Sequence, residues 1–432
     1  MRTRLSPAAA AVAAAFALLS APVQATNGYL AHGYGMKAIG MGGASIALPQ
    51  DAIAAASNPA GMAMLGNRVD FGLNWFSPTG REAQVVGSPA PFNGSTYDGD
   101  GKKNFFIPEF GYNQMLSNAM SFGVSVYGNG GMNTEYNKPF PLFCSSPPNP
   151  GCSNPGVDLS QLFIAPTLGY KITPEHAVGV SLNLAFQRFK ATGLQNFTAP
   201  SGPMQFSAYP ASVTDQGYEN SYGVGVRVGY LGQFTPNFAV GLTYQSKTSM
   251  SEFDAYKGLF AQQGGFDIPA NYGIGLAFKP MAGLTIAADV VWIDYSGIKS
   301  INNPLLPNLF QAQLGTDGGA GFGWEDVTAY KLGVQYAINP QWTVRGGYNY
   351  GKQPIPQSET FFNFLAPGVI ESHWTLGATW TLENKSELSF SFMYAPSVTV
   401  NGVNSIPPAF GGGNINLKMG EMSLGVAYGW KF

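Results

Sequence analysis

The feature that most constrains this chain is a one-by-one alternation of apolar and polar side chains that recurs from Asn67 to the last residue. In the stretch from Arg68 to Phe76, the odd-numbered residues are apolar, and the even-numbered ones up to Asn74 are polar or glycine. A period of two places the two sets on opposite faces of a β-strand. Further stretches of this kind include residues 120–126, 178–186, 222–230, 238–244, 272–278, 284–292, 330–338, 342–350, 374–382, 388–394 and 422–432. The pattern predicts an all-β chain.

Short and long connections alternate between these strands. The short connections are residues 116–118, 173–175, 235–237, 279–283, 339–340 and 383–385. The long ones are residues 77–103, 128–158, 191–220, 248–268, 297–325, 353–372 and 396–416. Short turns at one end and long loops at the other are typical of outer-membrane barrels, and the tally predicts a transmembrane antiparallel β-barrel of about 14 strands.

Composition favours a membrane barrel over a soluble protein or a helical membrane protein. Of the 432 residues, 11% are charged, whereas about 25% are charged in a typical soluble protein. Beyond the N-terminus, no uninterrupted apolar run approaches the roughly 20 residues that a membrane-spanning helix needs. The formal net charge of −2 provides no basic surface field, so nucleic acid is excluded as a partner.

The N-terminus carries a signal for export. Arg2 and Arg4 precede an Ala-rich apolar run at residues 8–19, and residues 23–25 form a small-residue cleavage site. This arrangement predicts a signal peptide over residues 1–25. A membrane anchor is disfavoured because the apolar run is too short to span a bilayer.

The final strand, residues 422–432, ends with Tyr428, Trp430 and Phe432 on one face. Alternating aromatics that end in Phe resemble the C-terminal signal of outer-membrane barrels. We therefore expect a monomer in the outer membrane of a Gram-negative bacterium, in contact with its lipid and lipopolysaccharide. The expected assembly partner is the barrel-assembly machinery, which would read the strand ending in Phe432.

The segment from Thr26 to Leu65 differs in kind from the rest of the chain. It is rich in Gly and Ala and shows no strand alternation. A barrel of about fourteen strands encloses a lumen that must be plugged or lined. We therefore predict a plug, or hatch, over residues 26–66, held inside a barrel formed by residues 67–432.

Three motifs in this segment carry a family resemblance. They are GMGGA at residues 40–44, DA at residues 51–52 and NPA at Asn58, Pro59 and Ala60. Together they resemble the start of the FadL family of outer-membrane transporters for long-chain fatty acids and other hydrophobic compounds. The resemblance implies a fourteen-stranded barrel with an N-terminal hatch, passive uptake through a lumenal ligand site, and a side opening near a kinked third strand.

The predicted third strand runs into Gly128, Asn129, Gly130 and Gly131. Glycines there permit a bulge or inward bend that would break pairing with a neighbour and leave a lateral opening in the wall. The hatch would then supply backbone partners, and the resemblance places the motif at Asn58 beside the opening. Alternatively, these glycines begin the outer loop.

The substrate stays open between fatty acids, related lipids and aromatic hydrocarbons. A fatty acid would benefit from a cation beside its carboxylate, and the candidates near the outer ends of strands are Arg188, Lys190, Lys247 and Lys257. An uncharged aromatic hydrocarbon needs no such partner.

Cys144 and Cys152 are the two cysteines of the chain. In an oxidising compartment they are predicted to form a disulfide within the second outer loop. The histidines His32, His176 and His373 have no metal-ligand spacing, and no nucleophile-elbow pattern occurs. We therefore expect no metal site, no cofactor, no catalytic residues and no enzyme activity.

Two other functions remain open. A general diffusion porin would show a polar constriction of opposed charge rings and no plug. A structural or adhesive surface barrel would use long loops, such as residues 128–158 and 297–325, as its interaction surface. The hatch-like segment favours a transporter of hydrophobic compounds over both.

Overall fold

The computed structural model describes residues 27–89, 92–145, 151–199 and 205–432. The predicted signal peptide, residues 1–25, lies outside the described residues. Among the helices of the described residues, none has both the length and the apolar character needed to cross a membrane.

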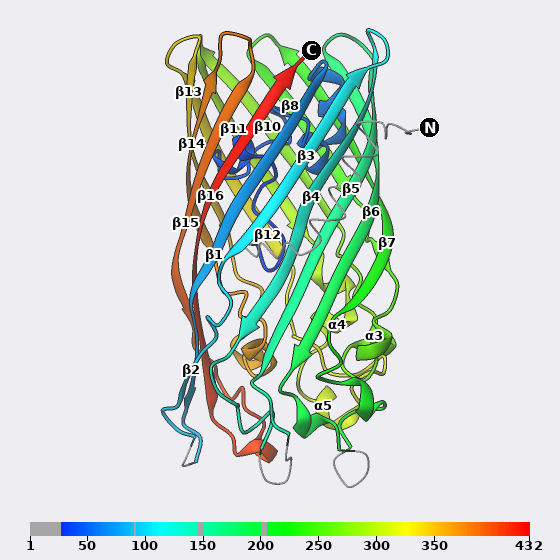
Figure 1. The fold of residues 1–432 in the computed structure, drawn as a ribbon, viewed down its shortest axis with the longest axis vertical. Helices are drawn as coiled ribbons and strands as arrows, with labels where there is room; N and C mark the ends of the chain where they lie inside the picture. The colour runs from blue at the N-terminus through cyan, green and yellow to red at the C-terminus, as the bar shows by residue number, and fades with distance from the viewer. Residues whose placement is uncertain (1–26, 90–91, 146–150, 200–204) are drawn as a thin grey trace, which may run out of the picture.

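Fourteen long antiparallel strands of the described chain form a closed barrel (Figure 1). They are β1 (Arg68–Val86), β3 (Phe105–Met115), β4 (Met120–Glu135), β5 (Gly156–Lys171), β6 (His176–Thr192), β7 (Glu219–Thr235), β8 (Phe238–Gln245), β10 (Asn271–Met281), β11 (Leu284–Ile293), β12 (Val327–Ala337), β13 (Trp342–Gly351), β14 (Ser372–Thr381), β15 (Glu387–Val400) and β16 (Asn414–Lys431). Each pairs with the next, and β16 closes the barrel on β1. Two short strands, β2 (Thr96–Asp98) and β9 (Ser249–Met250), add to β1 and β7. The predicted all-β antiparallel barrel is confirmed.

The connections are short at one end of the barrel and long at the other, and the C-terminus lies at the short-turn end (Figure 1). Before β1 come α2 (Met36–Ile39), η1 (Ala54–Ala56) and η2 (Pro59–Met64). The long connections contain η3 (Gln195–Phe197), η4 (Pro210–Ser212), η5 (Asp254–Tyr256), α3 (Ala261–Gly264), η6 (Tyr295–Gly297), α4 (Lys299–Asn302), α5 (Asn308–Gln311), η7 (Gln357–Glu359), η8 (Phe362–Phe364) and η9 (Pro408–Phe410).

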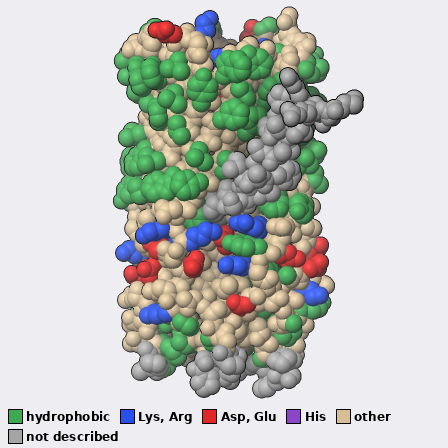
Figure 2. All heavy atoms as spheres, viewed as in Figure 1, with side chains coloured by type: hydrophobic (Ala, Val, Ile, Leu, Met, Phe, Trp, Pro, Cys, Tyr) green, Lys and Arg blue, Asp and Glu red, His purple; other side chains and the backbone are tan. Residues whose placement is uncertain are grey.

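The strands present apolar side chains outward along the short-turn part of the barrel (Figure 2). On β6 and β7, the exposed residues Val178, Leu182 and Val226 are examples, whereas Ser181 and Asn183 are buried on the inner face. Apolar side chains toward lipid and small or polar ones toward the lumen are what a membrane barrel requires. Below this apolar region a belt of charged side chains crosses the surface (Figure 2).

Nearer the long loops, the apolar side chains lie on the inner face of the wall and the polar side chains on the outer face. On β6, Phe189 and Ala191 are buried on the inner face. The strand alternation places Arg188 and Lys190 on the opposite, outer face. Here the wall faces water outside and packed loops inside, so the apolar residues point inward.

Several predicted loops are too long because of this exchange of faces, and two of them show it most clearly. Residues 77–103 are expected as loop, but β1 continues to Val86, and residues 128–158 include the end of β4 and the start of β5. When strands are predicted from outward-facing apolar residues, each predicted strand stops where those residues stop, at the edge of the membrane zone. The strands instead continue as paired sheet beyond that edge.

The long loops pack together over the mouth of the barrel. Phe140 stacks on Phe364 with ring centroids 4.5 Å apart, and the hydroxyl of Tyr136 donates to the carbonyl of Phe364 at 2.6 Å. Glu359 accepts a hydrogen bond from the backbone N–H of Leu305 at 2.8 Å, and burial raises the pKa of its carboxyl group. These contacts join connections far apart in sequence, so the mouth has an apolar core of its own.

Candidate functional site

Residues 27–65 lie inside the barrel (Figure 1). The backbone N–H of Ser45 donates to Oδ2 of Asp289 on β11 at 2.7 Å. The N–H of Gly42 donates to Oγ1 of Thr375 on β14 at 2.8 Å. Polar side chains of the lumen thus satisfy backbone groups of a segment that has little regular structure of its own.

The Asn58 motif anchors the segment to β6 and β7. Oδ1 of Asn58 accepts a hydrogen bond from the N–H of Ala60 at 3.1 Å, which caps η2. Its Nδ2 donates to the carbonyl of Tyr230 on β7 at 2.9 Å. A Cβ added at Gly179 of β6 would lie 2.3 Å from the carbonyl carbon of Pro59. The wall accommodates the motif because no side chain stands there.

A buried ion cluster joins the N-terminal segment to the barrel wall. Nζ of Lys37 lies 2.5 Å from Oε2 of Glu387 on β15, and Nη2 of Arg68 lies 3.0 Å from the same oxygen. Arg68 also pairs with Asp70 at 2.7 Å. Because removing one partner of a buried ion pair leaves an uncompensated charge, the cluster resists displacement of the Lys37 turn.

The glycines predicted at the third barrel strand lie within β4 and do not begin a loop. The register between β4 and β5 shifts by one residue between Gly128 and Gly130, as in a β-bulge. The N-terminal segment pairs with β4 at this point, because Leu30 bridges Gly130 and the N–H of Gly131 donates to the carbonyl of Tyr29 at 2.9 Å. A Cβ added at Gly130 would lie 2.1 Å from that Tyr29 oxygen, so this pairing requires glycine.

The expected neighbour of this bulge is different in the structure. Asn58, Pro59 and Ala60 lie beside β6 and β7, and the residues opposite the bulge are Tyr29 and Leu30. The reason is the backbone conformation. The tight turn from Asn27 to Leu30 leaves the carbonyl of Tyr29 free to accept from β4, whereas the residues after Asn58 form a capped helical turn.

The wall is interrupted between β3 and β4. Their ladder ends where Phe110 lies opposite Val126, and no further pair joins them among the described residues. Beyond this point, residues 105–109 of β3 pair with β1, whereas residues 127–135 of β4 pair with β5. We call the space bounded by residues 105–109 and 127–134 the window, because Glu135 is hydrogen-bonded to the backbone of Gly99 and Gly101.

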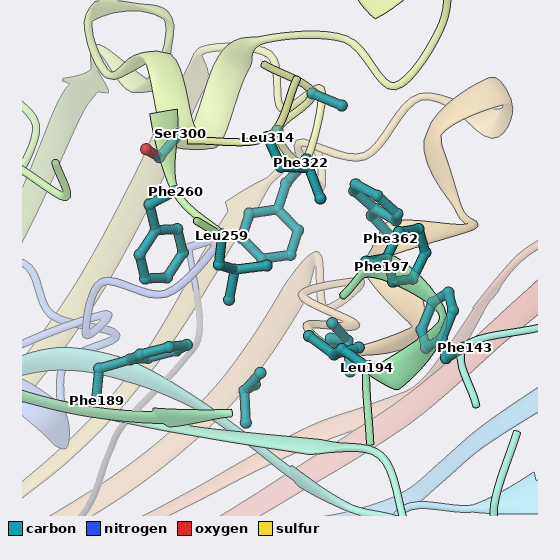
Figure 3. Close-up of a pocket in the computed structure, with 14 residues that line it drawn as sticks. Phe143, Phe189, Leu194, Phe197, Leu259, Phe260, Ser300, Leu314, Phe322 and Phe362 are labelled. Atoms are coloured by element: carbon teal, nitrogen blue, oxygen red, sulfur yellow. The ribbon is translucent and has the colours of Figure 1, made fainter. Parts of the chain in front are cut away.

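An apolar cavity lies among the long loops (Figure 3). Its wall includes Phe143, Phe189, Phe197, Phe260, Phe322 and Phe362. The side chain of Ser300 also lines it, and its hydroxyl donates to the carbonyl of Gly265 at 2.6 Å. A wall of this kind suits a hydrophobic molecule without charged groups.

A second cavity adjoins the N-terminal segment at Gly28. Phe105 of β3 and Met132 of β4 both line it, so it touches both strands of the window. Trp324 and Glu421 form other parts of its wall.

The four candidate cations lie elsewhere. Arg188, Lys190 and Lys257 each lie over a tyrosine ring, at 4.2, 5.2 and 5.1 Å from its centroid. Nζ of Lys247 lies 2.8 Å from a carboxylate oxygen of Asp267. None of the four is among the described residues that line the two cavities.

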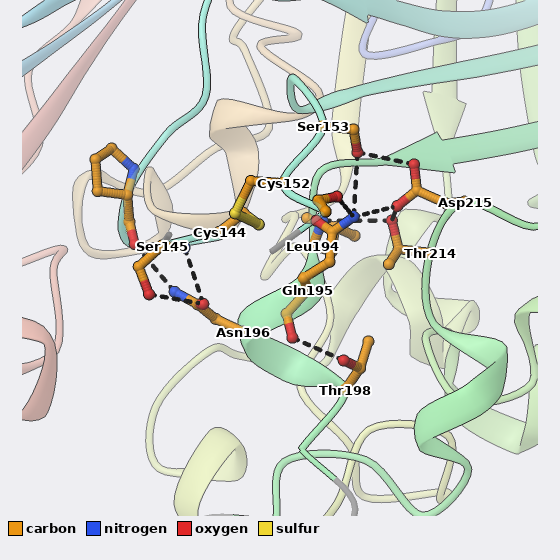
Figure 4. Close-up of a disulfide and its surroundings, with 12 residues drawn as sticks. Cys144, Ser145, Cys152, Ser153, Leu194, Gln195, Asn196, Thr198, Thr214 and Asp215 are labelled. Atoms are coloured by element: carbon orange, nitrogen blue, oxygen red, sulfur yellow. Dashed lines mark hydrogen bonds between the residues drawn. A yellow bond between two sulfur atoms is a disulfide. The ribbon is translucent and has the colours of Figure 1, made fainter. Parts of the chain in front are cut away.

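Cys144 and Cys152 are joined by a disulfide in the connection between β4 and β5, with their Cα atoms 5.6 Å apart (Figure 4). Next to them, the N–H of Ser145 donates to Oδ1 of Asn196 at 3.1 Å, and Nε2 of Gln195 donates to Oγ of Ser153 at 3.2 Å. The crosslinked loop is thus held against the connection between β6 and β7.

We expect thiol titration of the denatured, unreduced protein to find no free thiol, and titration after reduction to find both. Replacing both cysteines by Ser is expected to destabilise this loop by about 2.5 kcal/mol, because the unfolded loop gains conformational entropy. Limited proteolysis should then cut the loop sooner while the barrel stays SDS-resistant. Two free thiols in the unreduced protein would contradict the assignment.

Comparisons with known proteins agree with this architecture. The model of the family described as outer membrane protein transport protein (OMPP1/FadL/TodX) matches residues 8–414. Among solved structures, the P. putida toluene transporter TodX is similar over 93% of this chain and 99% of its own, with 18% identity and a TM-score of 0.68. The Ralstonia pickettii toluene transporter TbuX has the same coverage and identity with a TM-score of 0.63.

A Pseudomonas aeruginosa FadL homologue is similar over 94% of this chain and 100% of its own, with 15% identity and a TM-score of 0.64. No curated protein sequence matches the chain. The resemblance carried by the N-terminal motifs is confirmed by the family match, which extends over nearly the whole sequence. The chain therefore belongs to the OMPP1/FadL/TodX family of outer membrane transport proteins.

Proposed function

We propose that this protein carries hydrophobic compounds passively through the two cavities and sideways out of the window into the membrane. The observation that supports this proposal most is the position of the second cavity. Its wall contains Phe105 and Met132, one from each strand that bounds the window. A compound held there lies next to the place where the wall has no main-chain hydrogen bonds of its own.

The apolar walls account for binding without an energy source. Each Å² of apolar surface removed from water contributes about 25 cal/mol. A hydrophobic compound is therefore drawn from water into the first cavity, and later from the second cavity into lipid. Movement down its concentration gradient needs no further input.

We further propose that residues 27–65 act as a hatch. The pairing of Tyr29 and Leu30 with β4 covers the window from the inside. Buried backbone groups need hydrogen-bond partners, and the hatch supplies them at the bulge. Passage of a compound then requires this short pairing to open, while the ion cluster at Lys37 keeps the rest of the hatch in place.

Filling the first cavity tests the proposed function. Ala320 is buried in its wall, and the ring of Ala320→Phe would occupy space that a ligand needs. We expect this variant to bind less radiolabelled toluene as purified protein and to take it up more slowly in proteoliposomes. Val403→Phe, which adds a ring at an exposed loop position outside the cavity wall, is the matched control and should behave like the wild type.

The same proteoliposomes separate the transporter from a general porin. The wild type is expected to pass toluene and to retain trapped sucrose, because the hatch fills the lumen. Release of sucrose together with unchanged toluene uptake in Ala320→Phe would favour the porin.

A further inference from the structure

The second cavity carries a feature that points to the class of compound it accepts. We propose that the second cavity selects hydrophobic compounds bearing an uncharged hydroxyl group, and that Glu421 of β16 is the residue that recognises this group. This inference rests on the proposed function.

Glu421 is a buried carboxyl group without a hydrogen-bond partner. Its residue is 1% exposed, and neither carboxyl oxygen has a partner among the described residues. The nearest basic atom is Nε2 of His373, at 3.9 Å from Oε2, which is too far for a hydrogen bond. A buried polar group left unpaired is costly, so a partner that arrives with the ligand gains binding free energy.

The other polar side chains of this wall already have partners. The indole N–H of Trp324 donates to Oδ1 of Asn363 at 2.6 Å. Nδ2 of Asn133 donates to the carbonyl of Val157 at 3.2 Å, and its Oδ1 accepts from Arg81 at 3.0 Å. Among the described lining residues, the Glu421 carboxyl is therefore the unpartnered polar group.

The required partner is a hydrogen-bond donor attached to an apolar body. Phe76, Phe105, Met132 and Met419 line the cavity and favour a hydrophobic body. A hydroxyl group supplies the donor at low desolvation cost, whereas an ammonium group would have to bring a full charge into this apolar space.

A ligand carboxylate is disfavoured at this position. It would bring a full negative charge into this apolar space, where no free cation lines the wall among the described residues. Arg81 offers such a group no hydrogen bond, because its guanidinium nitrogens already donate to Asp100, Asn133 and the carbonyl of Lys102. The cavity therefore distinguishes compounds by their head group and not by their apolar body.

Three probes with one apolar body test this inference: toluene, 4-methylphenol and 4-methylbenzoate. Binding to the purified protein in detergent is measured at pH 7, where the phenol is uncharged because phenolic pKa values lie near 10. We expect the wild type to bind 4-methylphenol more tightly than the other two. Glu421→Leu should weaken 4-methylphenol binding about tenfold while toluene binding holds or improves.

Two further variants keep the test decisive. Glu421→Gln keeps the side-chain volume and should lose part of the preference for the phenol. It replaces Glu421→Leu if the Leu variant no longer migrates in SDS as a folded, heat-modifiable barrel. Glu359→Gln makes the same chemical change at a buried carboxyl that already accepts a hydrogen bond from Leu305 and does not line the cavity. It should keep the wild-type preference.

The outcomes separate this inference from the proposed function. Toluene binding equal to or tighter than phenol binding in the wild type, or equal losses for both in the Glu421 variants, overturns the inference alone. Binding of none of the three probes by the wild type overturns the proposed function as well.

Discussion

A disulfide engineered across the window, between Ile107→Cys and Gly128→Cys, will stop uptake of hydrophobic compounds and leave their binding to the purified protein unchanged. The two positions face each other beyond the end of the ladder between β3 and β4, and a Cβ added at Gly128 would lie 2.9 Å from Cγ2 of Ile107. Such proximity allows a disulfide between the two strands. The crosslink would hold the window closed while both cavities remain accessible from the mouth.

Toluene uptake by proteoliposomes, before and after reduction, measures the effect. Reduction should restore uptake in the crosslinked protein. The matched controls are the two single-cysteine variants and the wild type, whose native disulfide at Cys144 is exposed to the same reductant. Uptake at the wild-type rate in fully crosslinked protein would reject the lateral route and indicate passage past the hatch.

The barrel could be predicted from the sequence because lipid imposes a strict period of two. Outward residues such as Leu73 and Leu182 must be apolar, and their inward neighbours need not be. The ends of the strands could not be predicted in the same way. On β1, Ala83 and Val85 are buried although the strand has left the apolar zone, and the register shifts between Thr79 and Glu82. The alternation of apolar and polar residues does not show at which position the apolar residues change from the outer face to the inner face.

The candidate site was predictable only in part. Gly130 and Gly131 indicate a bulge, because a side chain larger than that of glycine would clash where two main chains approach each other closely. The partner of that bulge could not be read from the sequence, because Tyr29 and Leu30 reach β4 across about a hundred residues of chain. Glu421 was missed because an acid in an alternating strand looks like any lumenal polar residue. Its isolation depends on a cavity that several distant segments form together.

Deletion of residues 26–65 will convert the protein into an open pore with an intact barrel. Apart from the bulge at Gly130 and Gly131, the strands hydrogen-bond to one another around a closed ring that includes the pairing of β1 with β16, so the wall keeps most of its main-chain pairing without the hatch. Glu387 loses Lys37 but keeps Arg68 at 3.0 Å and Lys431 at 2.6 Å, so it stays paired. What is lost is the material that fills the lumen.

Conductance in planar bilayers and heat-modifiable migration in SDS measure the two parts of this prediction. The deletion variant should conduct strongly and still migrate as a folded barrel. The double variant Cys144→Ser and Cys152→Ser, which alters an outer loop and leaves the hatch intact, should stay closed. Loss of the folded barrel would show that the hatch is a structural part of the barrel. Conductance no higher than in the wild type would show that the hatch does not close the pore.

Combining the deletion with the crosslink from Ile107→Cys to Gly128→Cys separates the two routes out of the lumen. With the hatch present, the crosslinked protein has no open route and should take up no toluene. Without the hatch, toluene can pass through the lumen to the other side, so the combined variant should recover uptake although its window is held shut. If the combined variant stays blocked, the obstruction lies in the outer cavities, and the crosslink must have distorted them and not the window.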